Sequence, residues 1–294
     1  MAARVFVLGG SVAVGAAATS PEKTWHAVLE QELRRLLERD DIHVFNVAQG
    51  AFVTVQERLA FELAVLPRQP DLALFLDGAN DALLPASSGS RPGDPYQTGL
   101  RYAQIYGNPL WRFLAENSAV LSELARGSFA RYIKQAESEL ATDEERFRGY
   151  ARAVASAYAE NVAAVMNHCH AHGIACVTAL QPIRAVAATA LGRPAPSGIL
   201  PDRRQVDLFD ALKAEIADAA RSWPWLAEGF LDVSGAMNSE AGIAAFTDAV
   251  HLNDAGQVIL ATVLAGPIAD RLKSAIAHRS DAPPAHCRWV PPRR

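Results

Sequence analysis

The chain has few of the residues that stabilise small disulfide-bonded domains. Three cysteines, Cys169, Cys176 and Cys287, occur among 294 residues, and none has a partner at the spacing of a CxxC motif. No disulfide framework is predicted, and buried free thiols are the expected state. Basic residues are not in excess either, because 28 Lys and Arg stand against 32 Asp and Glu, a net charge of −4. We therefore expect no nucleic-acid partner.

No hydrophobic run is suited to crossing a membrane. A long uncharged stretch, residues 163–183, contains three histidines as well as Asn167 and Gln181, which a lipid-spanning helix would not tolerate. The N-terminus lacks a signal peptide, because strand-like residues follow Met1 within three positions. The sequence as printed predicts a cytoplasmic protein with no membrane span, or an exported or anchored protein if a leader or anchor has been removed.

The apolar residues, 50% of the chain, follow an alternation of strands and helices. Residues 4–8, 42–47 and 71–76 are short apolar runs that end near Gly, Asn or Asp, as strands do. Between them, residues 24–39 and 53–66 have apolar side chains at helical spacing. Continuous apolar strands suit a parallel sheet that is covered on both faces.

Residues 82–141 interrupt this alternation. The first part, 82–107, is rich in Pro, Gly, Ser and Tyr and predicts an irregular loop, and the rest predicts a discontinuous helix. We interpret the segment as a lid-like helical insertion after the third strand, since long loops inside a domain are often functional. Aromatic side chains in it could line an acyl or sugar site or simply anchor the loop: Tyr96, Tyr102, Tyr106 and Trp111.

The alternation returns after the insertion. We predict a helix over 143–172, with Thr142 as N-cap and Gly173 at its end, and then a strand over 174–180. A loop over 181–201, a helix over 203–222 and a weak strand over 230–233 follow. The last helix runs from Asn253 to about Ala277, and Gly266-Pro267 should kink it. The predicted fold class is α/β, a three-layer α/β/α flavodoxin-like sandwich with a parallel five-stranded sheet. It forms one domain over 1–280, followed by a Pro-rich tail over 281–294.

The first strand runs into residues 9–15, Gly-Gly-Ser-Val-Ala-Val-Gly. A phosphate loop is excluded, because Ala16-Ala17 stand where Lys and Ser or Thr must be. A dinucleotide site is excluded by the glycine spacing and by Asn46, which ends the second strand in place of an acid. A nucleophile loop remains, with Ser11 just before a helix whose N–H groups could face an oxyanion. The competing interpretation is a glycine turn in which Ser11 caps the helix.

A serine nucleophile needs a base, and the base needs a group that orients it. Asp248 precedes His251 by three residues, so its carboxylate can reach one ring nitrogen and leave the other free for a serine. The competing interpretation is a surface histidine beside a capping aspartate. Gly50 and Asn80 follow the second and third strands and could donate hydrogen bonds to a substrate oxygen, although such residues also occur in ordinary turns.

These features coincide at one edge of the predicted sheet. Ser11, Gly50 and Asn80 follow the carboxyl ends of successive strands, where open α/β sheets bind ligands. Together with Asp248 and His251 they resemble the ordered blocks of the SGNH (GDSL-type) hydrolases: Gly9-Gly10-Ser11 with Gly15, Asn46-Val47-Ala48-Gln49-Gly50, Asp77-Gly78-Ala79-Asn80-Asp81, and Asp248-Ala249-Val250-His251. The blocks have the order of the family and extend over most of the chain.

The resemblance implies roles for individual residues. Ser11 would be the nucleophile, His251 the general base and Asp248 the group that orients it. The oxyanion hole would consist of the N–H groups of Ser11 and Gly50 with the Asn80 side chain. The implied reaction is hydrolysis of a carboxylic ester through an acyl-serine, without metal or other cofactor, on a small acyl group or an acylated carbohydrate.

One residue departs from the family pattern. Gly10 replaces the aspartate that gives the GDSL motif its name, and this GGS variant is similar to a bacterial branch of the family whose members are often anchored or exported. Two alternatives stay open: transfer of the acyl group to a sugar hydroxyl, and a binding module without catalysis. The oligomeric state is not predicted.

Two further motifs have structural explanations. His168, His170 and His172 lie close enough for a metal site but lack further ligands, and histidines are favoured at the end of a helix in any case. Trp223-Pro224-Trp225 suits a packed helix end better than a sugar platform.

Overall fold

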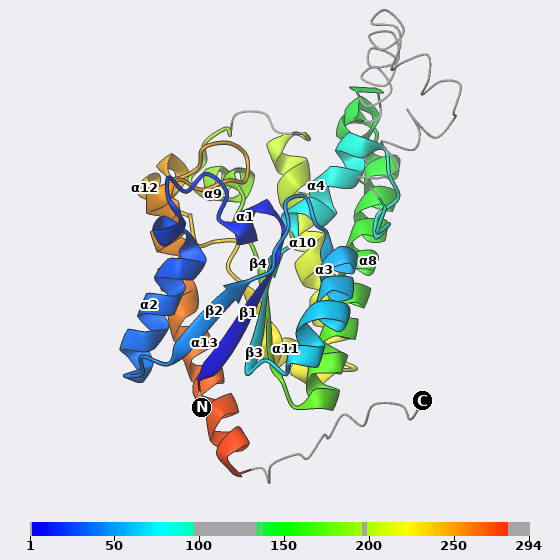
Figure 1. Ribbon diagram of the computed structural model, residues 1–294. Helices are drawn as coiled ribbons and strands as arrows, with labels where there is room; N and C mark the ends of the chain where they lie inside the picture. Colours follow the sequence, from blue (N-terminus) through cyan, green and yellow to red (C-terminus); the bar gives the residue numbers. More distant parts are fainter. Residues whose placement is uncertain (1, 97–133, 136, 196–198, 282–294) are drawn as a thin grey trace, which may run out of the picture.

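The computed structural model describes residues 2–96, 134–135, 137–195 and 199–281, and it confirms the predicted α/β class (Figure 1). A single five-stranded sheet has the order β2-β1-β3-β4-β5, and every neighbouring pair is parallel. Its strands are β1 (Ala3–Gly9), β2 (Ile42–Asn46), β3 (Leu72–Asp77), β4 (Ala175–Leu180) and β5 (Phe230–Asp232).

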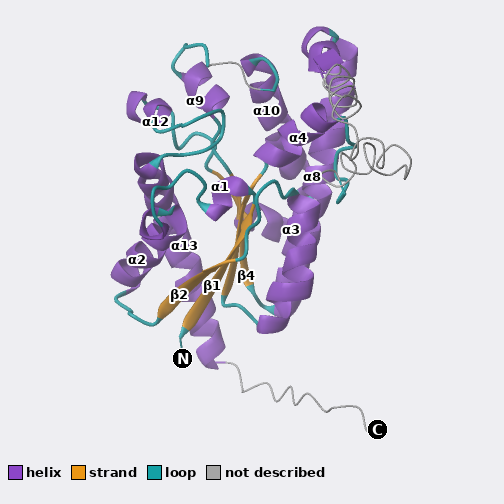
Figure 2. Cartoon of the chain, turned by 45° about the horizontal axis from the view of Figure 1, so that its top comes forward, coloured by secondary structure: helices purple, strands orange, loops and turns teal. Residues whose placement is uncertain are grey.

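Helices cover both faces of the sheet and make the predicted three layers (Figure 2). One face packs against α2 (Trp25–Leu37) and α13 (Asp254–Asp281), and the other against α3 (Thr54–Ala60), α8 (Glu144–His172) and α10 (Asp202–Ala219). The shorter elements are α1 (Ser11–Val14), α4 (Ala79–Ser88), α9 (Arg184–Ala190), α11 (Pro224–Gly229), α12 (Glu240–Ala244), the 3₁₀ turns η1 (Pro21–Lys23) and η3 (Leu66–Arg68), and the π turn η2 (Phe61–Val65).

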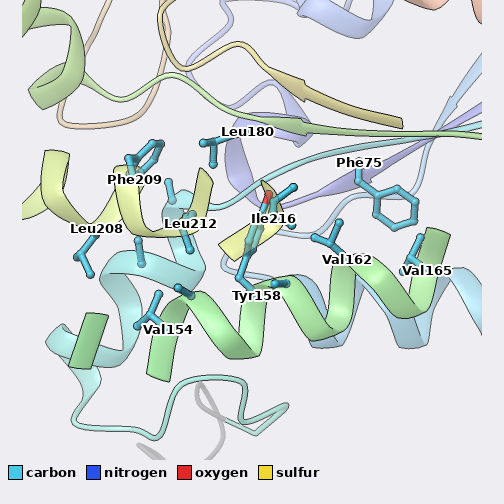
Figure 3. Close-up of a cluster of buried hydrophobic side chains, with 14 of the residues drawn as sticks. Phe75, Val154, Tyr158, Val162, Val165, Leu180, Leu208, Phe209, Leu212 and Ile216 are labelled. Carbon is cyan, nitrogen blue, oxygen red and sulfur yellow. The ribbon is translucent and has the colours of Figure 1, made fainter. Parts of the chain in front are cut away.

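The two faces of the sheet have separate hydrophobic cores. Every residue of β3 is buried, because this strand lies in the middle of the sheet and both of its faces are covered. The core on the α8 side packs Phe75 of β3 against Val162 and Val165, and in the same layer Tyr158 reaches from α8 toward the sheet (Figure 3). The other core centres on Trp25 of α2, which is fully buried.

The strand order determines where a ligand can bind. In the order 2-1-3-4-5 the chain leaves β1 on one side of the sheet and β3 on the other, so a crevice opens between their carboxyl ends. The loops that follow β1, β2 and β3 carry Ser11, Gly50 and Asn80, respectively.

Three local predictions are wrong. The loop expected over 82–107 begins later, because residues 82–88 belong to α4 even though Pro85 lies inside that helix. The Tyr150 hydroxyl inserts at the break, since it donates to Ala82 O (2.7 Å) and accepts from Ala86 N (3.0 Å). The loop expected over 181–201 contains the alanine-rich helix α9.

The third error concerns the cap of α8. Asp143 is the N-cap, with Oδ1 accepting from Glu145 N and Arg146 N (both 3.0 Å). The predicted cap, Thr142, donates its hydroxyl to Ser138 O (2.8 Å). The other end of α8 is as predicted, at Gly173 with φ 64°.

The last helix is longer than predicted. It begins after Asn253, whose Oδ1 accepts from Gly256 N (3.1 Å), and it extends to Asp281 instead of Ala277. The tail beyond residue 281 lies outside the described residues, as does most of the predicted insertion, with Tyr102, Tyr106 and Trp111. No helix in the described ranges has both the length and the apolar character that a membrane crossing requires.

Candidate active site

A tight turn places Ser11 at the carboxyl end of β1. Gly9 has φ 144°, and a Cβ there would lie 2.3 Å from Leu76 O, so the residue must be glycine. Gly10 is the N-cap of α1, which begins at Ser11, and Gly15 ends the helix in the left-handed conformation with φ 84°. Ser11 therefore lies inside the first turn and is not its cap.

Two side chains from other elements hold this turn in place. The indole N–H of Trp25 donates to Val12 O at 2.9 Å and to Ala13 O at 3.2 Å. The amide of Asn46, at the end of β2, also donates to Ala13 O, at 2.9 Å. Val12 O also accepts from Gly15 N, whereas Ala13 O depends on these side chains, because α1 has a single turn and leaves its last carbonyls open.

The structure brings Ser11, His251 and Asp248 into one hydrogen-bonded chain. Nε2 of His251 lies 2.8 Å from Ser11 Oγ, across 240 residues of sequence. Nδ1 of His251 lies 2.6 Å from Asp248 Oδ2. The other carboxylate oxygen, Oδ1, accepts from the backbone N–H groups of Val250 and His251 at 2.8 Å each. The spacing of three residues thus orients the ring through a local turn.

These hydrogen bonds determine the charge state of Asp248. Partial burial raises the pKa of its carboxyl group, but the bonds from His251 and from Val250 N outweigh that effect. The net result is a pKa below the ordinary value, so the carboxylate is ionised at neutral pH. An ionised Asp248 can only accept a hydrogen bond, so the neutral ring of His251 carries its proton on Nδ1, and Nε2 is left as the hydrogen-bond acceptor for Ser11.

Asn80 lies directly against the serine turn. Its Nδ2 donates to Phe52 O at 2.7 Å, which uses one of the two N–H bonds of the amide. A Cβ on Gly10 would lie 2.2 Å from the same nitrogen. No side chain fits at position 10 while Asn80 stays in place, and this accounts for the second glycine of the Gly-Gly-Ser sequence.

Gly50 is exposed and has a free backbone N–H. The segment before it is tied to β1 by Val47 N to Val7 O (2.9 Å) and Gln49 N to Gly9 O (3.0 Å). Within the described part of the chain the N–H of Gly50 has no acceptor, and the same holds for the N–H of Ser11. A Cβ on Gly50 would meet nothing within 4 Å, so neither sterics nor a positive φ requires glycine here.

A second set of bonds connects the loop after α1 to the start of α13. Asp254 accepts from the N–H and hydroxyl of Thr19 (2.8 and 2.7 Å) and pairs with Lys23 at 2.7 Å. The bonds from Lys23 and Thr19 lower the pKa of Asp254 to about 2. One turn later, Gln257 Oε1 accepts from Trp25 N at 3.0 Å, and its Nε2 donates to Leu252 O at 2.9 Å.

Sequence patterns do not reveal these supporting residues. Trp25 falls within the predicted helix over 24–39 and Asn46 ends the second predicted strand, and nothing in either pattern indicates a bond to α1. Two weak signals are present in the sequence. Asn46 lies four residues before Gly50, and Trp25 carries a polar N–H on a large apolar side chain that needs an acceptor when buried.

The histidine motif has other contacts. His168 pairs with Glu62 at 3.2 Å, and the ring of His170 stacks on Trp225 with centroids 4.4 Å apart. Trp225 also donates to Asn167 Oδ1 at 2.9 Å, but Trp223 and Pro224 are exposed. Trp225 alone of the predicted packed motif has such a contact, and the motif lies at the start of α11. Across the described ranges, no three metal-ligating side chains converge on a common point. Cys169 and Cys176 are buried free thiols, and Cys287 is outside those ranges.

Comparison with known proteins identifies one protein family by sequence and several solved structures with a similar fold. The sequence profile of the GDSL-like lipase/acylhydrolase family matches residues 7–259. No curated protein matches the chain by sequence. Similar structures include an acetyl xylan esterase, AlAXEase, at 15% identity and TM-score 0.50, covering 93% of this chain and 99% of that one.

Two other structures have the same degree of similarity. A lipase/acylhydrolase from Enterococcus faecalis is 14% identical with TM-score 0.51, covering 92% of this chain and 96% of that one. A variant of an acetyl-xylooligosaccharide esterase from Geobacillus Stearmophilus is 14% identical with TM-score 0.50, covering 92% of this chain and 94% of that one. At such identities the structures establish a shared fold, including the parallel sheet.

Proposed function

Because the chain belongs to the GDSL-like lipase/acylhydrolase family and is therefore a carboxylic ester hydrolase, we propose that it cleaves its substrate through an acyl intermediate on Ser11, with His251 as general base and Asp248 as the orienting carboxylate. One observation carries the proposal. The 2.8 Å contact from Ser11 Oγ to His251 Nε2 and the 2.6 Å contact from His251 Nδ1 to Asp248 Oδ2 form the relay that nucleophilic catalysis requires.

The first half of the reaction forms the acyl-serine. Ser11 Oγ attacks the carbonyl carbon while its proton passes to Nε2 of His251, and Asp248 stabilises the resulting imidazolium. The carbonyl oxygen becomes an oxyanion. We assign its stabilisation to the N–H groups of Ser11 and Gly50, which have no acceptor within the described residues, and to the second N–H of the Asn80 amide. Collapse of the intermediate breaks the ester bond, and His251 returns the proton to the departing alcohol.

The second half repeats these steps with water as nucleophile. Water gives a proton to His251 Nε2 and attacks the acyl carbon, and the second intermediate collapses to release the acid and restore Ser11. The proposed substrate class is an ester of a small acyl group, with acetylated carbohydrates the first to test. Two enzymes of the same fold are named for acetylated xylan or xylooligosaccharide, and this motivates that choice.

Substitution of the nucleophile tests the proposal. We expect Ser11→Ala to lower kcat for p-nitrophenyl acetate by roughly 10⁴- to 10⁶-fold, the usual cost of removing a serine nucleophile. The melting temperature should stay near the wild-type value. Ser156→Ala, which loses only a surface bond to Glu160, is the matched control and should keep full activity.

Labelling with a fluorophosphonate identifies the reacting residue directly. The modified peptide should contain Ser11 in the wild-type protein and in Ser156→Ala, and no label should bind Ser11→Ala. An unlabelled wild-type protein would favour a binding module without catalysis. An acylated oligosaccharide product in the presence of a sugar acceptor would favour acyl transfer over hydrolysis.

A further inference from the structure

Three carboxyl groups lie buried next to Asn80. Glu57 of α3, Asp77 at the end of β3 and Asp81 of α4 are 1%, 3% and 7% exposed. We call them the acid cluster. Asp77 and Asp81 flank residues 78–80, so the cluster supports the segment that carries Asn80 from both ends.

The hydrogen-bond donors around the acid cluster are unevenly shared. Asp81 accepts from Thr54 N at 3.1 Å and from the Thr54 hydroxyl at 2.6 Å. Asp77 Oδ1 accepts from the Tyr158 hydroxyl at 2.7 Å, the side chain that reaches from α8 in Figure 3. Both oxygens of Glu57 and Oδ2 of Asp77 have no donor.

No cation compensates for these carboxyl groups in the residues that the structure describes. Arg58, next to Glu57 in α3, pairs with Glu62 instead, at 3.6 Å. From α8 the cluster is faced by the neutral hydroxyl groups of Tyr158 and Tyr150. Three unpaired negative charges in such a place would be strongly unfavourable. A carboxylate cannot donate a hydrogen bond to another carboxylate, so a hydrogen bond between two of these groups requires that the cluster hold a proton.

We propose that Glu57 is protonated at neutral pH and donates a hydrogen bond to Oδ2 of Asp77, and that this shared proton keeps Asn80 in place beside Ser11. The inference rests on the proposed function, since it makes Glu57 and Asp77 positioning residues for Asn80. The proton belongs on Glu57, because Asp77 already has a donor in Tyr158 whereas Glu57 has none.

The electrostatics of the acid cluster agree with this assignment. Burial raises the pKa of Glu57 well above its ordinary value, and the charges of Asp77 and Asp81 and a side-chain hydrogen bond with Asp77 raise it further. Burial, followed by the charge of Asp81, raises the pKa of Asp77 to about 7, although the bond from Tyr158 opposes this. Burial raises the pKa of Asp81 to about 6 against the bonds from Thr54. Loss of the shared proton above neutral pH places like charges behind Asn80.

The pH profile of Glu57→Gln tests the proposal. In the wild-type protein kcat should fall on the alkaline side, approaching about tenfold per pH unit, with KM unchanged. The introduced side-chain amide donates to Asp77 at every pH, so in Glu57→Gln the alkaline limb should disappear. Glu62→Gln, which removes a partly exposed carboxylate from the following turn, should keep the wild-type limb. An identical limb in Glu57→Gln and wild type would overturn the proposal.

Two further measurements separate positioning from simple structural support. Glu57→Ala removes the donor, so its kcat should drop while KM stays constant, and Glu57→Gln should rescue kcat. Infrared spectroscopy should show the carbonyl band of a protonated carboxyl group at pH 7 in wild type and Glu62→Gln, and a weaker band in Glu57→Gln. The absence of that band in wild type would overturn the proposal even if the enzyme is active. A band without esterase activity would contradict the proposed function alone.

Discussion

Asp248 and the acid cluster are carboxyl groups at the same edge of the sheet in opposite situations. The Asp248 side chain is 55% exposed and accepts three hydrogen bonds, two of them from backbone N–H groups. Glu57 is buried and accepts none. The pKa of Asp248 is accordingly below its ordinary value, whereas that of Glu57 is well above. The supply of donors and water, not the position along the sheet, decides whether a carboxyl group here carries charge or holds a proton.

Asp248→Asn replaces the exposed, ionised carboxylate by a neutral amide, and among the carboxyl-group variants it should lower kcat the most. An amide at this position donates to Nδ1 and forces the proton of His251 onto Nε2, where it can no longer accept from Ser11. We expect kcat to fall by about 10⁴-fold. The melting temperature should change little because the site is solvated. Asp210→Asn, on an exposed carboxylate paired with Lys213, is the control; equal activity of the two variants would exclude the relay.

Asn80 connects the two regions, and its removal should have the next largest effect. Asn80→Ala deletes a donor to the oxyanion, so kcat should fall by about 10²- to 10³-fold with a small change in KM. Gly50→Ala is the matched comparison, because it retains the backbone N–H and its Cβ enters open space. It should keep kcat within about threefold if Gly50 acts through its backbone alone. An unchanged kcat in Asn80→Ala would reduce Asn80 to a turn residue.

The free energy of unfolding should depend on pH in opposite ways for the acid cluster and for Asp248, although the effect is smaller than the expected changes in kcat. In the acid cluster the folded protein holds protons that the unfolded chain has lost, so the unfolding free energy should fall as pH rises from about 5 through 7. Asp248 and Asp254 have lowered pKa values, so their contribution should be lost as pH falls below about 4. The melting temperature, measured as a function of pH, should therefore decrease both as pH rises through about 7 and as it falls below about 4.

Asp81→Asn sharpens that measurement. It removes one of the like charges and keeps an oxygen that can accept from Thr54, so the neutral-to-alkaline limb should flatten. We expect Tm at pH 8 to exceed the wild-type value by roughly 2–4 °C, with the acid limb unchanged. A variant that melts below wild type at pH 8 would show that the charge of Asp81 is compensated after all.

The parts of the fold that were predictable have a repeating pattern in the sequence. The central strands are predictable because apolar runs such as the one in β3 are buried on both faces, whereas the edge strands β2 and β5 are partly exposed. The seven-residue helix α9 was missed because Pro182 and Gly192 lie close to its two ends and indicated a loop. The insertion of the Tyr150 hydroxyl at Pro85 joins residues 64 and 68 positions apart, which no local pattern contains.

The candidate site was predictable to the extent that its residues follow strand ends or lie close together in sequence. Asp248 and His251 are three residues apart, so their contact follows from local geometry. Glu57 belongs to a helix in which a charged residue ordinarily marks the solvent side. Its burial depends on how α3 packs against β1 and α8, and periodicity alone cannot show that.

The bonds from Trp25 to Gln257 and from Ser11 to His251 span 232 and 240 residues. A ribosome adds residues one at a time from the N-terminus, so the serine turn is made long before the histidine it needs. Under the proposed mechanism a nascent chain has no contact between Ser11 and His251 until residue 251 has left the exit tunnel. Translation order alone would therefore keep the serine turn without its base while the intervening residues are made.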